Sequence, residues 1–243
     1  MQIAAFQEFI QGLVSLVYPP HCALCQLPLD SAAPHALCRR CATGLPLNPP
    51  PWCGGCGRSL AGLGVDVATC AGCREHPVGL VASRAACRYD GAAKACVLRL
   101  KYHAQLGLVV PMAERMAAVA QMAPGLLANA LVPVPLASVR LRERTFNQAE
   151  LLAEAVAPRL GLPVLARTLV RSRATDPQNQ LDAAHRRRNV AGAFAVRHPA
   201  AIRGRSLVLI DDVVTTGATT SACARALREA GAASVSLLAF AHG

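Results

Sequence analysis

Four Cys-x-x-Cys pairs lie within the first third of the chain and constrain its fold more than any other feature. The pairs are Cys22/Cys25, Cys38/Cys41, Cys53/Cys56 and Cys70/Cys73. Two such pairs supply the four soft ligands that a structural zinc ion takes in a tetrahedron. Twelve residues separate the first two pairs and thirteen separate the last two, which predicts two successive ribbons with one ion each. A cross-brace that joins the first pair to the third and the second to the fourth would use the same residues.

The segment from residue 21 to residue 80 is rich in Cys, Pro and Gly and holds few apolar runs. A module of this size and composition usually needs a metal or cross-links to fold. We therefore predict a double zinc ribbon over residues 21–80, held by one or two structural zinc ions. Redox dithiols are the alternative, but the four motifs lack the strand–helix context of redox chemistry. Cys87, Cys96 and Cys223 stand alone in expected strands and helices, and we interpret them as small buried hydrophobic residues.

Residues 1–20 are predicted to form one amphipathic helix. Apolar residues recur at helical spacing from Ile3 to Val17, and Pro19-Pro20 ends the helix. The polar face carries no Lys or Arg, which favours docking on the rest of the protein over binding to a membrane surface. The stretch is too short to span a bilayer, and the N-terminus lacks the features of a signal peptide. We therefore expect no membrane span and a cytoplasmic location.

From about residue 83 the sequence alternates between short apolar runs and longer stretches with helical periodicity. Strands are expected at residues 131–135, 193–196, 206–211 and 234–240, and helices at residues 92–102, 106–122, 148–160 and 219–230. Such alternation predicts an α/β domain over residues 81–243, with a mostly parallel sheet flanked by helices on both faces. The segment from about Thr168 to Val190 is polar and Arg-rich, and we predict a long mobile loop there.

The formal net charge of +11 arises entirely after residue 80, because residues 1–80 contain as many acidic residues as arginines. A segregated positive charge concentrates anions such as polyphosphates or nucleic acid. Nearly all of these cations are Arg, with Lys only at positions 94 and 101, which suits planar contacts to phosphate. Aromatic residues make up only 4% of the chain, which argues against a dedicated stacking platform for single-stranded nucleic acid.

The most specific motif runs from Leu207 to Thr220. Four apolar residues predict a buried central strand, and Asp211 and Asp212 follow at the carboxyl edge, where open α/β sheets bind ligands. A Thr-Thr-Gly turn then leads into a helix, so that backbone N–H groups and Thr hydroxyls form an anion site. Gly217 allows the backbone to come close to a phosphate. One ligand that carries both a phosphate and vicinal hydroxyls would satisfy the whole motif.

This run resembles the motif with which type I phosphoribosyltransferases bind phosphoribosyl pyrophosphate (PRPP). The resemblance implies the type I phosphoribosyltransferase fold, with Asp211 and Asp212 on the ribose hydroxyls. The loop that it places around the 5-phosphate consists of Val213, Val214, Thr215, Thr216, Gly217, Ala218 and Thr219. It also implies Mg²⁺ bound together with PRPP, where the ion would bridge pyrophosphate and ribose oxygens.

Further segments are similar to one family of such proteins, the ComF family. They are Val132-Pro133-Val134-Pro135-Leu136, then Arg140, Arg144, Phe146, Asn147 and Gln148, then Thr175, Gln178, Leu181, Arg186, Asn189, Val190 and Phe194, and also Leu100-Lys101-Tyr102. Together with the cysteine pairs, the resemblance covers nearly the whole chain from residue 20. It implies that Arg140, Arg142 and Arg144 are candidate contacts of the polyphosphate. The sequence departs from the family at Thr145, where Gly is usual.

Three functions fit these features. The first is a phosphoribosyltransferase of unknown acceptor, in which Asp211 and Asp212 support catalysis and Arg186 closes over the departing pyrophosphate. A solvated charge on the loop is the alternative interpretation of Arg186. The family resemblance implies a link to natural competence, so the second function is a PRPP-binding adaptor in DNA uptake. Its partners would be single-stranded DNA and competence proteins such as a helicase or a recombination mediator. The third is a PRPP-responsive regulator that has lost catalysis.

Overall fold

The computed structural model describes residues 20–29, 36–62, 68–122, 125–126, 128–173 and 183–243. The helix predicted over residues 1–20 therefore lies outside the described residues, apart from its last position. Within the described residues, no helix is both long enough and apolar enough to cross a membrane.

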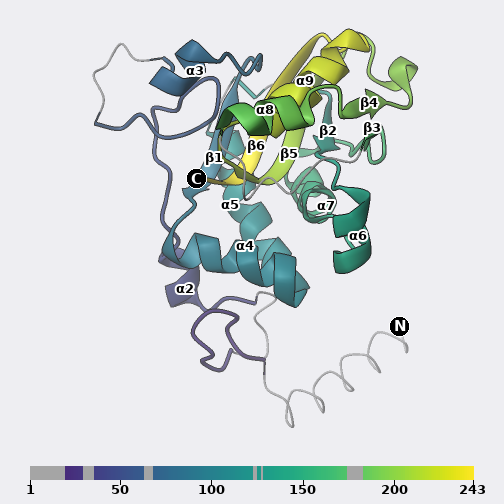
Figure 1. The fold of residues 1–243 in the computed structure, drawn as a ribbon. Helices are drawn as coiled ribbons and strands as arrows, with labels where there is room; N and C mark the ends of the chain where they lie inside the picture. Colours follow the sequence, from purple (N-terminus) through teal and green to yellow (C-terminus); the bar gives the residue numbers. More distant parts are fainter. Residues whose placement is uncertain (1–19, 30–35, 63–67, 123–124, 127, 174–182) are drawn as a thin grey trace.

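A four-stranded parallel sheet forms the centre of the larger domain (Figure 1). Its strands are β1 (Ser83–Arg88), β2 (Ala130–Pro133), β5 (Ser206–Val214) and β6 (Ser234–His242). They lie in the order β1-β6-β5-β2, and every pairing is parallel. Because β5 and β6 occupy the middle, their residues are buried on both faces, as their continuous apolar sequences predict. The predicted mostly parallel sheet is confirmed.

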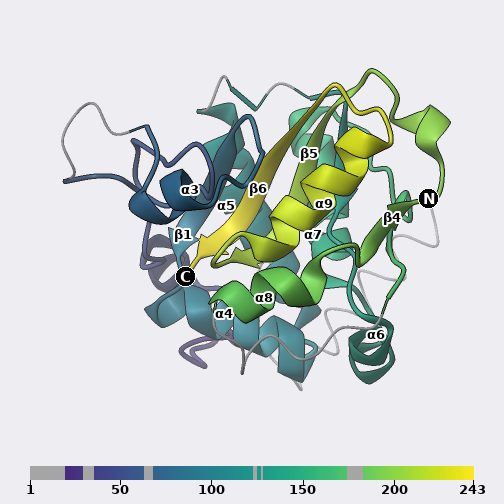
Figure 2. The same ribbon diagram turned by 45° about the horizontal axis from the view of Figure 1, so that its top comes forward.

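Helices cover both faces of this sheet, and Figure 2 shows α9 (Ala218–Glu229) in front of it with α5 (Val109–Gln121) and α7 (Gln148–Leu160) behind. Residues of β5 point alternately to the two sides, as the two-residue period of a strand requires. Val208 and Ile210 pack in the core on the α5 and α7 side, whereas Leu207 and Leu209 pack in the core that holds α9. Helix α4 (Gly91–His103) follows β1 and packs its Leu100 into the first of these cores.

Local signals explain where the helices begin and end. Helix α7 begins after Asn147, whose side chain accepts a hydrogen bond from the N–H of Ala149 at 3.1 Å, and it ends at Gly161 in the left-handed conformation. Its observed bounds are those predicted. The helix expected at residues 106–122 begins instead with a 3-10 turn, η1 (Leu106–Leu108), and α5 follows. Pro111 lies in the first turn of α5, where a missing N–H costs nothing.

The prediction of a long loop from Thr168 to Val190 is wrong for the described part of that segment. It contains β3 (Leu169–Arg171), which pairs antiparallel with β4 (Phe194–Val196), and helix α8 (Ala183–Val190), which packs beside α9. The strand is only three residues long, and its partner follows after α8, so no local sequence pattern indicated the pair. Residues 174–182 lie outside the described residues.

Several short elements were not predicted. They are α2 (Arg39–Thr43), α3 (Ala71–Glu75), α6 (Ser138–Arg144), the 3-10 turn η3 (Pro199–Ala201) and the edge strand β1. Helix α6 follows β2 and presents a helical face beside the carboxyl end of the sheet. It ends at Thr145, whose φ of +67° is a left-handed conformation that favours glycine. Thr145 thus has the backbone conformation that the usual Gly adopts readily.

A buried histidine, His242, ends β6 and makes acid stability testable. The side chain is 8% exposed, and its Nε2 atom has no hydrogen-bond partner among the described residues. Burial, with the positive charge of Arg58, lowers the pKa of His242 to about 4. In the unfolded chain, His242 is therefore protonated below about pH 6.5, whereas in the native protein it stays neutral until about pH 4. The native protein consequently loses stability as the pH falls from 6.5 towards 4.

Between pH 7.0 and pH 5.0 we expect His242→Gln to lose less stability than the natural protein, by about 2 kcal/mol. Urea unfolding at pH 7.0 and pH 5.0 measures the difference for each protein. Zinc thiolates also take up protons in acid, so only the difference between the two proteins is informative. Equal losses in both proteins would contradict a buried, neutral His242.

Candidate functional site

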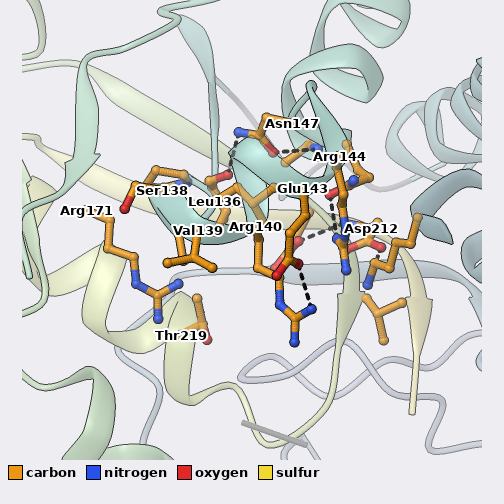
Figure 3. A pocket seen from close by; sticks show the side chains of 18 of the residues that line it. Leu136, Ser138, Val139, Arg140, Glu143, Arg144, Asn147, Arg171, Asp212 and Thr219 are labelled. Carbon is orange, nitrogen blue, oxygen red and sulfur yellow. Dashed lines mark hydrogen bonds and ion pairs between the residues drawn. The ribbon is translucent and has the colours of Figure 1, made fainter. Parts of the chain in front are cut away.

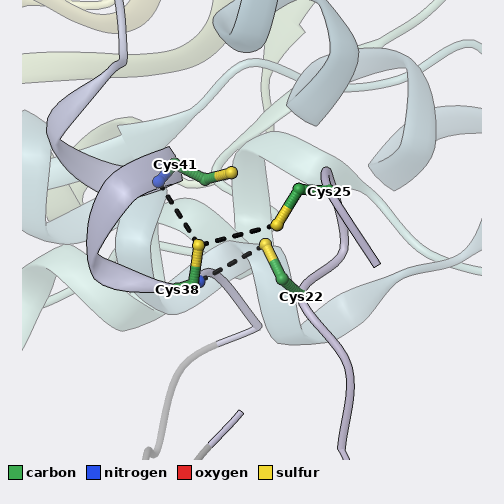
Figure 4. A group of neighbouring side chains, drawn as sticks. All are labelled: Cys22, Cys25, Cys38 and Cys41. Carbon is green, nitrogen blue, oxygen red and sulfur yellow. Dashed lines mark hydrogen bonds between the residues drawn. The ribbon is translucent and has the colours of Figure 1, made fainter. Parts of the chain in front are cut away.

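The eight paired cysteines form two clusters, each with the four sulfur atoms within 4.8 Å of one another. Figure 4 shows the first, made by Cys22, Cys25, Cys38 and Cys41. The second is made by Cys53, Cys56, Cys70 and Cys73. Sulfur atoms at about 2.3 Å from a tetrahedral zinc ion lie about 3.8 Å apart. The Sγ atoms of Cys25 and Cys38 are 3.7 Å apart, and those of Cys56 and Cys70 are 3.8 Å apart, so both clusters are consistent with structural zinc.

The clusters also decide how the pairs combine: the first pair joins the second and the third joins the fourth. The ribbons are therefore successive, and the cross-brace does not occur. Backbone N–H groups point at the sulfur atoms, as from Cys38 to Cys22 at 3.4 Å and from Cys70 to Cys53 at 3.3 Å. Burial opposes ionisation of Cys22, but hydrogen bonds from neighbouring N–H groups lower its pKa to about 6. Such a thiol is readily a thiolate, which is the form that binds zinc.

The two ribbons dock on different parts of the larger domain. The first ribbon rests on α4 and α5, where Arg99 donates to the carbonyl of Ala23 and Arg115 donates to that of Ala42 at 2.9 Å. The second ribbon rests on β1, where the Ser83 hydroxyl donates to the carbonyl of Gly55 at 2.7 Å.

The tail of the second ribbon, residues 76–78, lies beside the loop between β5 and α9. Val78 is buried in a small core with Cys53, Cys56, Leu60 and Cys73. A Cβ atom added at Gly217 would lie 3.1 Å from the Cγ2 atom of Val78, so this side chain packs directly against the loop. Gly217 itself has a φ of +73° and precedes the first residue of α9.

The predicted anion loop closes around a small hollow. A cavity of about 50 Å³ is lined by Asp211 and by residues 213–220. Strand β5 extends through Val214, so the two aspartates lie within the strand rather than at its end. Thr215 and Thr216 are exposed on the turn, and the Thr220 hydroxyl donates to the carbonyl of Gly217 at 3.0 Å. A glycine with positive φ and the start of a helix supply the geometry of an anion site.

A larger cleft of about 610 Å³ adjoins this hollow, and the two share Asp211, Val213 and Thr219. Figure 3 shows side chains that line this cleft, among them Arg140, Asp212 and Thr219. Its walls come from the end of α4, the segment after β2, α6, the start of α7, β3 and β5. Arg140 and Arg144 line it from α6, as expected of residues four apart on one helical face. Arg142, the third candidate, is exposed elsewhere on α6.

The two cleft arginines have partners of their own. Arg140 forms an ion pair with Glu143 at 2.9 Å. Arg144 donates to the side-chain oxygen of Gln148 at 3.1 Å, and its guanidinium lies 5.1 Å from the centre of the Tyr102 ring. Both side chains are partly exposed, so they remain accessible to an anion that enters the cleft.

The acidic pair lies deep in this cleft and contacts a lysine. The Nζ atom of Lys101 is 2.5 Å from the Oδ2 atom of Asp212, and an Oδ1 atom of Asp211 accepts a hydrogen bond from the N–H of Asp212 at 2.8 Å. Burial, together with the negative charge of Asp212, raises the pKa of Asp211. Burial disfavours the charged form of Lys101, but attraction to Asp212 and Asp211 outweighs it and raises the pKa of the amine.

Sequence reasoning missed Lys101, Tyr102 and Arg171 as cleft residues. The first two belong to the Leu-Lys-Tyr segment, which could have indicated them, but nothing local relates residue 101 to residue 212. Arg171 lies in β3, inside the segment predicted to be a loop. Arg186 lies in α8, and its proposed contact with pyrophosphate stays a prediction.

This fold and these clusters define a phosphoribosyltransferase-type α/β domain that carries a double zinc ribbon. The family model "Double zinc ribbon domain" matches residues 13–74, and the model "Phosphoribosyl transferase domain" matches residues 147–243. The chain is 32% identical to DNA utilization protein YhgH of Salmonella typhimurium over 225 residues, which are 90% of this chain and 96% of the relative. The chain therefore belongs to the ComF family, as its motifs predicted.

Two further relatives have names that refer to competence. Competence protein F of Haemophilus influenzae is 36% identical over 106 residues, which are 43% of this chain and 46% of the relative. Competence protein ComFC of Bacillus subtilis is 38% identical over 107 residues, which are 44% of this chain and 41% of the relative. The family is thus linked by name to DNA utilization and competence.

Proposed function

We propose that the protein binds PRPP in the cleft at the carboxyl edge of the sheet. The observation that carries this proposal is that two hollows meet: the small hollow of the anion loop adjoins the cleft that contains the acidic pair, and Asp211 lines both. PRPP carries a 5-phosphate for the loop, vicinal hydroxyls for the carboxylates and a pyrophosphate for the arginines of α6. No simpler anion would engage all three groups.

Each group of residues has a proposed role. Backbone N–H groups of residues 213–219 bind the 5-phosphate, and Asp211 and Asp212 bind the ribose hydroxyls. Arg140 and Arg144 bind the pyrophosphate, and Arg186 closes over it. Carboxylate oxygens in a cleft that admits a polyphosphate suit Mg²⁺, so Asp211 and Asp212 are the residues that would hold the ion with PRPP. When bound, Mg²⁺ supplies positive charge that stabilises the departing pyrophosphate.

The reaction that we propose is phosphoribosyl transfer to an acceptor that no residue yet identifies. In this reaction the arginines of α6 hold the pyrophosphate as negative charge builds on it, and the walls of the cleft exclude water from the anomeric carbon. We also propose that the protein works in the cytoplasm, because free thiols that can hold zinc fit a reducing compartment.

The names of the relatives favour a second candidate, a PRPP-binding adaptor in DNA uptake or utilization that does not catalyse transfer. Its partners would be single-stranded DNA and competence proteins such as a helicase or a recombination mediator. The net charge of +11 is compatible with phosphate contacts of this kind. Product formation with candidate acceptors would support the enzyme, whereas salt-dependent binding of single strands without any product would support the adaptor.

Calorimetric titration of PRPP with Mg²⁺ tests the proposed site. We expect the natural protein to bind and the variant Asp211→Asn/Asp212→Asn to lose binding by at least about a hundredfold, because both hydroxyl acceptors change. The variant leaves Lys101 without its ionic partner, so zinc content and thermal melting must show that it is folded. A folded, zinc-loaded natural protein that does not bind PRPP would contradict the proposal.

A further inference from the structure

Lys101 reaches the acidic pair from a part of the chain outside the phosphoribosyltransferase motif. It lies in the last turn of α4, and the matched phosphoribosyltransferase segment begins only at residue 147. Its side chain is 21% exposed, and its Nζ atom contacts the Oδ2 atom of Asp212, whose side chain is 9% exposed. This ion pair lies in the wall of the cleft where we place the ribose of PRPP.

The charges around Lys101 hold its ammonium on the aspartates. Asp211 and Asp212 attract it from β5, and Arg144 repels it from α6. Tyr89 and Tyr102 also lie in this charge cluster, and the Tyr102 ring lies under the Arg144 guanidinium. An ammonium placed on one carboxylate of a buried pair offsets the repulsion between the two acids. It also occupies the Oδ2 atom of Asp212, one of the oxygens that the pair could offer to a divalent cation.

We propose that Lys101 is the resident counter-ion of Asp211 and Asp212, and that it makes binding of the divalent metal depend on PRPP. The inference rests on the proposed PRPP site. Without PRPP, a metal ion that enters alone must displace a lysine already bonded to Asp212. When PRPP arrives with its metal, the pyrophosphate offers Lys101 a new anionic partner, and the aspartates are released to the ribose hydroxyls and the ion. Lys101 is thus a positioning residue for the ligand and sets the order in which the ligands bind.

Binding of Mn²⁺ to the PRPP-free, zinc-loaded protein is the direct test, because this ion substitutes for Mg²⁺ and its free form gives an electron paramagnetic resonance signal. We expect Lys101→Met to bind Mn²⁺ at least tenfold more tightly than the natural protein. Lys101→Arg keeps the charge and should bind Mn²⁺ as weakly as the natural protein. The triple variant Lys101→Met/Asp211→Asn/Asp212→Asn should lose the tight site, which would locate the ion on the acidic pair.

Two results would overturn the proposal: equal Mn²⁺ affinities of Lys101→Met and the natural protein, or tight Mn²⁺ binding to the natural protein without PRPP. Thermal melting and zinc content check the fold of each variant. If Lys101→Met is unfolded, Lys101→Gln removes the same charge with a side chain that can still hydrogen-bond Asp212, and the same comparison applies.

A second part of the experiment measures the affinity of each variant for PRPP. Lys101→Met should weaken binding of PRPP with Mg²⁺ about tenfold, and Lys101→Arg should restore most of the loss. Because the Mn²⁺ arm contains no PRPP, the two proposals can fail separately. Suppose that Lys101→Met binds Mn²⁺ tightly and the natural protein does not bind PRPP. This result would support Lys101 as the counter-ion of the aspartates and contradict PRPP as the ligand of the cleft.

Discussion

Replacing Cys73 with Ser is expected to weaken PRPP binding by roughly tenfold or more, a loss of about 1.4 kcal/mol. The equivalent change in the first ribbon, Cys41→Ser, should leave PRPP binding nearly unchanged. Both variants remove the fourth cysteine of a cluster, and each should lose one zinc ion. The difference between them arises from where the two ribbons dock.

The second ribbon contacts the anion loop directly. Its small core holds Cys73 and Val78 together, and Val78 packs against Gly217. The tail of this ribbon and the loop also line a shared pocket of about 200 Å³ between α9 and the end of α8. Without the second ion, the ribbon core loses its cross-link, and the loop loses the surface that supports its shape. The first ribbon instead contacts α4 and α5 through Arg99 and Arg115.

The measurement is calorimetric titration of PRPP with Mg²⁺ into both variants, with zinc content from elemental analysis. Amide hydrogen exchange of residues 213–220 provides a second observation, since the loop should exchange faster in Cys73→Ser and not in Cys41→Ser. Equal affinities in the two variants, with one zinc ion lost from each, would show that the second ribbon does not support the loop. No zinc in the natural protein would refute both ribbons.

Gly217→Val is expected to reduce PRPP affinity by about a hundredfold, or about 2.7 kcal/mol. Two causes combine at this position. A φ of +73° costs an L-residue about 1–2 kcal/mol and is worse for a β-branched side chain. In addition, the new Cβ atom would lie 3.1 Å from Val78, which is closer than most packed carbon contacts. The loop can relieve both only by leaving the shape in which we propose that it encloses the phosphate.

A control variant tests the effect of backbone strain outside the loop, and a double variant tests the contact with Val78. Gly204 has nearly the same φ, +70°, but a Cβ atom added there would meet nothing within 4 Å. Gly204→Val should therefore lose stability with little loss of PRPP affinity.

The double variant Gly217→Ala/Val78→Ala removes the close contact, so it should bind PRPP better than Gly217→Ala alone. If Val78→Ala does not improve PRPP binding by the Gly217→Ala protein, a steric conflict with Val78 is not a cause of the loss.

Much of the fold could be predicted because its signals are local. The bounds of α7 follow from apolar periodicity, the Asn147 cap and Gly161, all within fifteen consecutive residues. The buried strand at Leu207–Ile210 and the turn before α9 are equally local. Pairing between distant segments has no such signal. The β3–β4 pair joins residues on either side of α8, and the short apolar run of β1 becomes a strand only because β6 pairs with it.

The candidate site divides in the same way. The sequence alone determined the eight cysteines, the acidic pair and the anion loop, because each is a short motif in which spacing and residue type carry the chemistry. It left open how the cysteine pairs combine and did not indicate Lys101 as a partner of Asp212. Those features depend on which surfaces meet when β1, β6, β5 and β2 assemble and bury their apolar faces. Strand order reflects burial summed over the whole chain. Only the tertiary structure therefore decided that α4 supplies the cation that pairs with Asp212 and that the second ribbon contacts the loop.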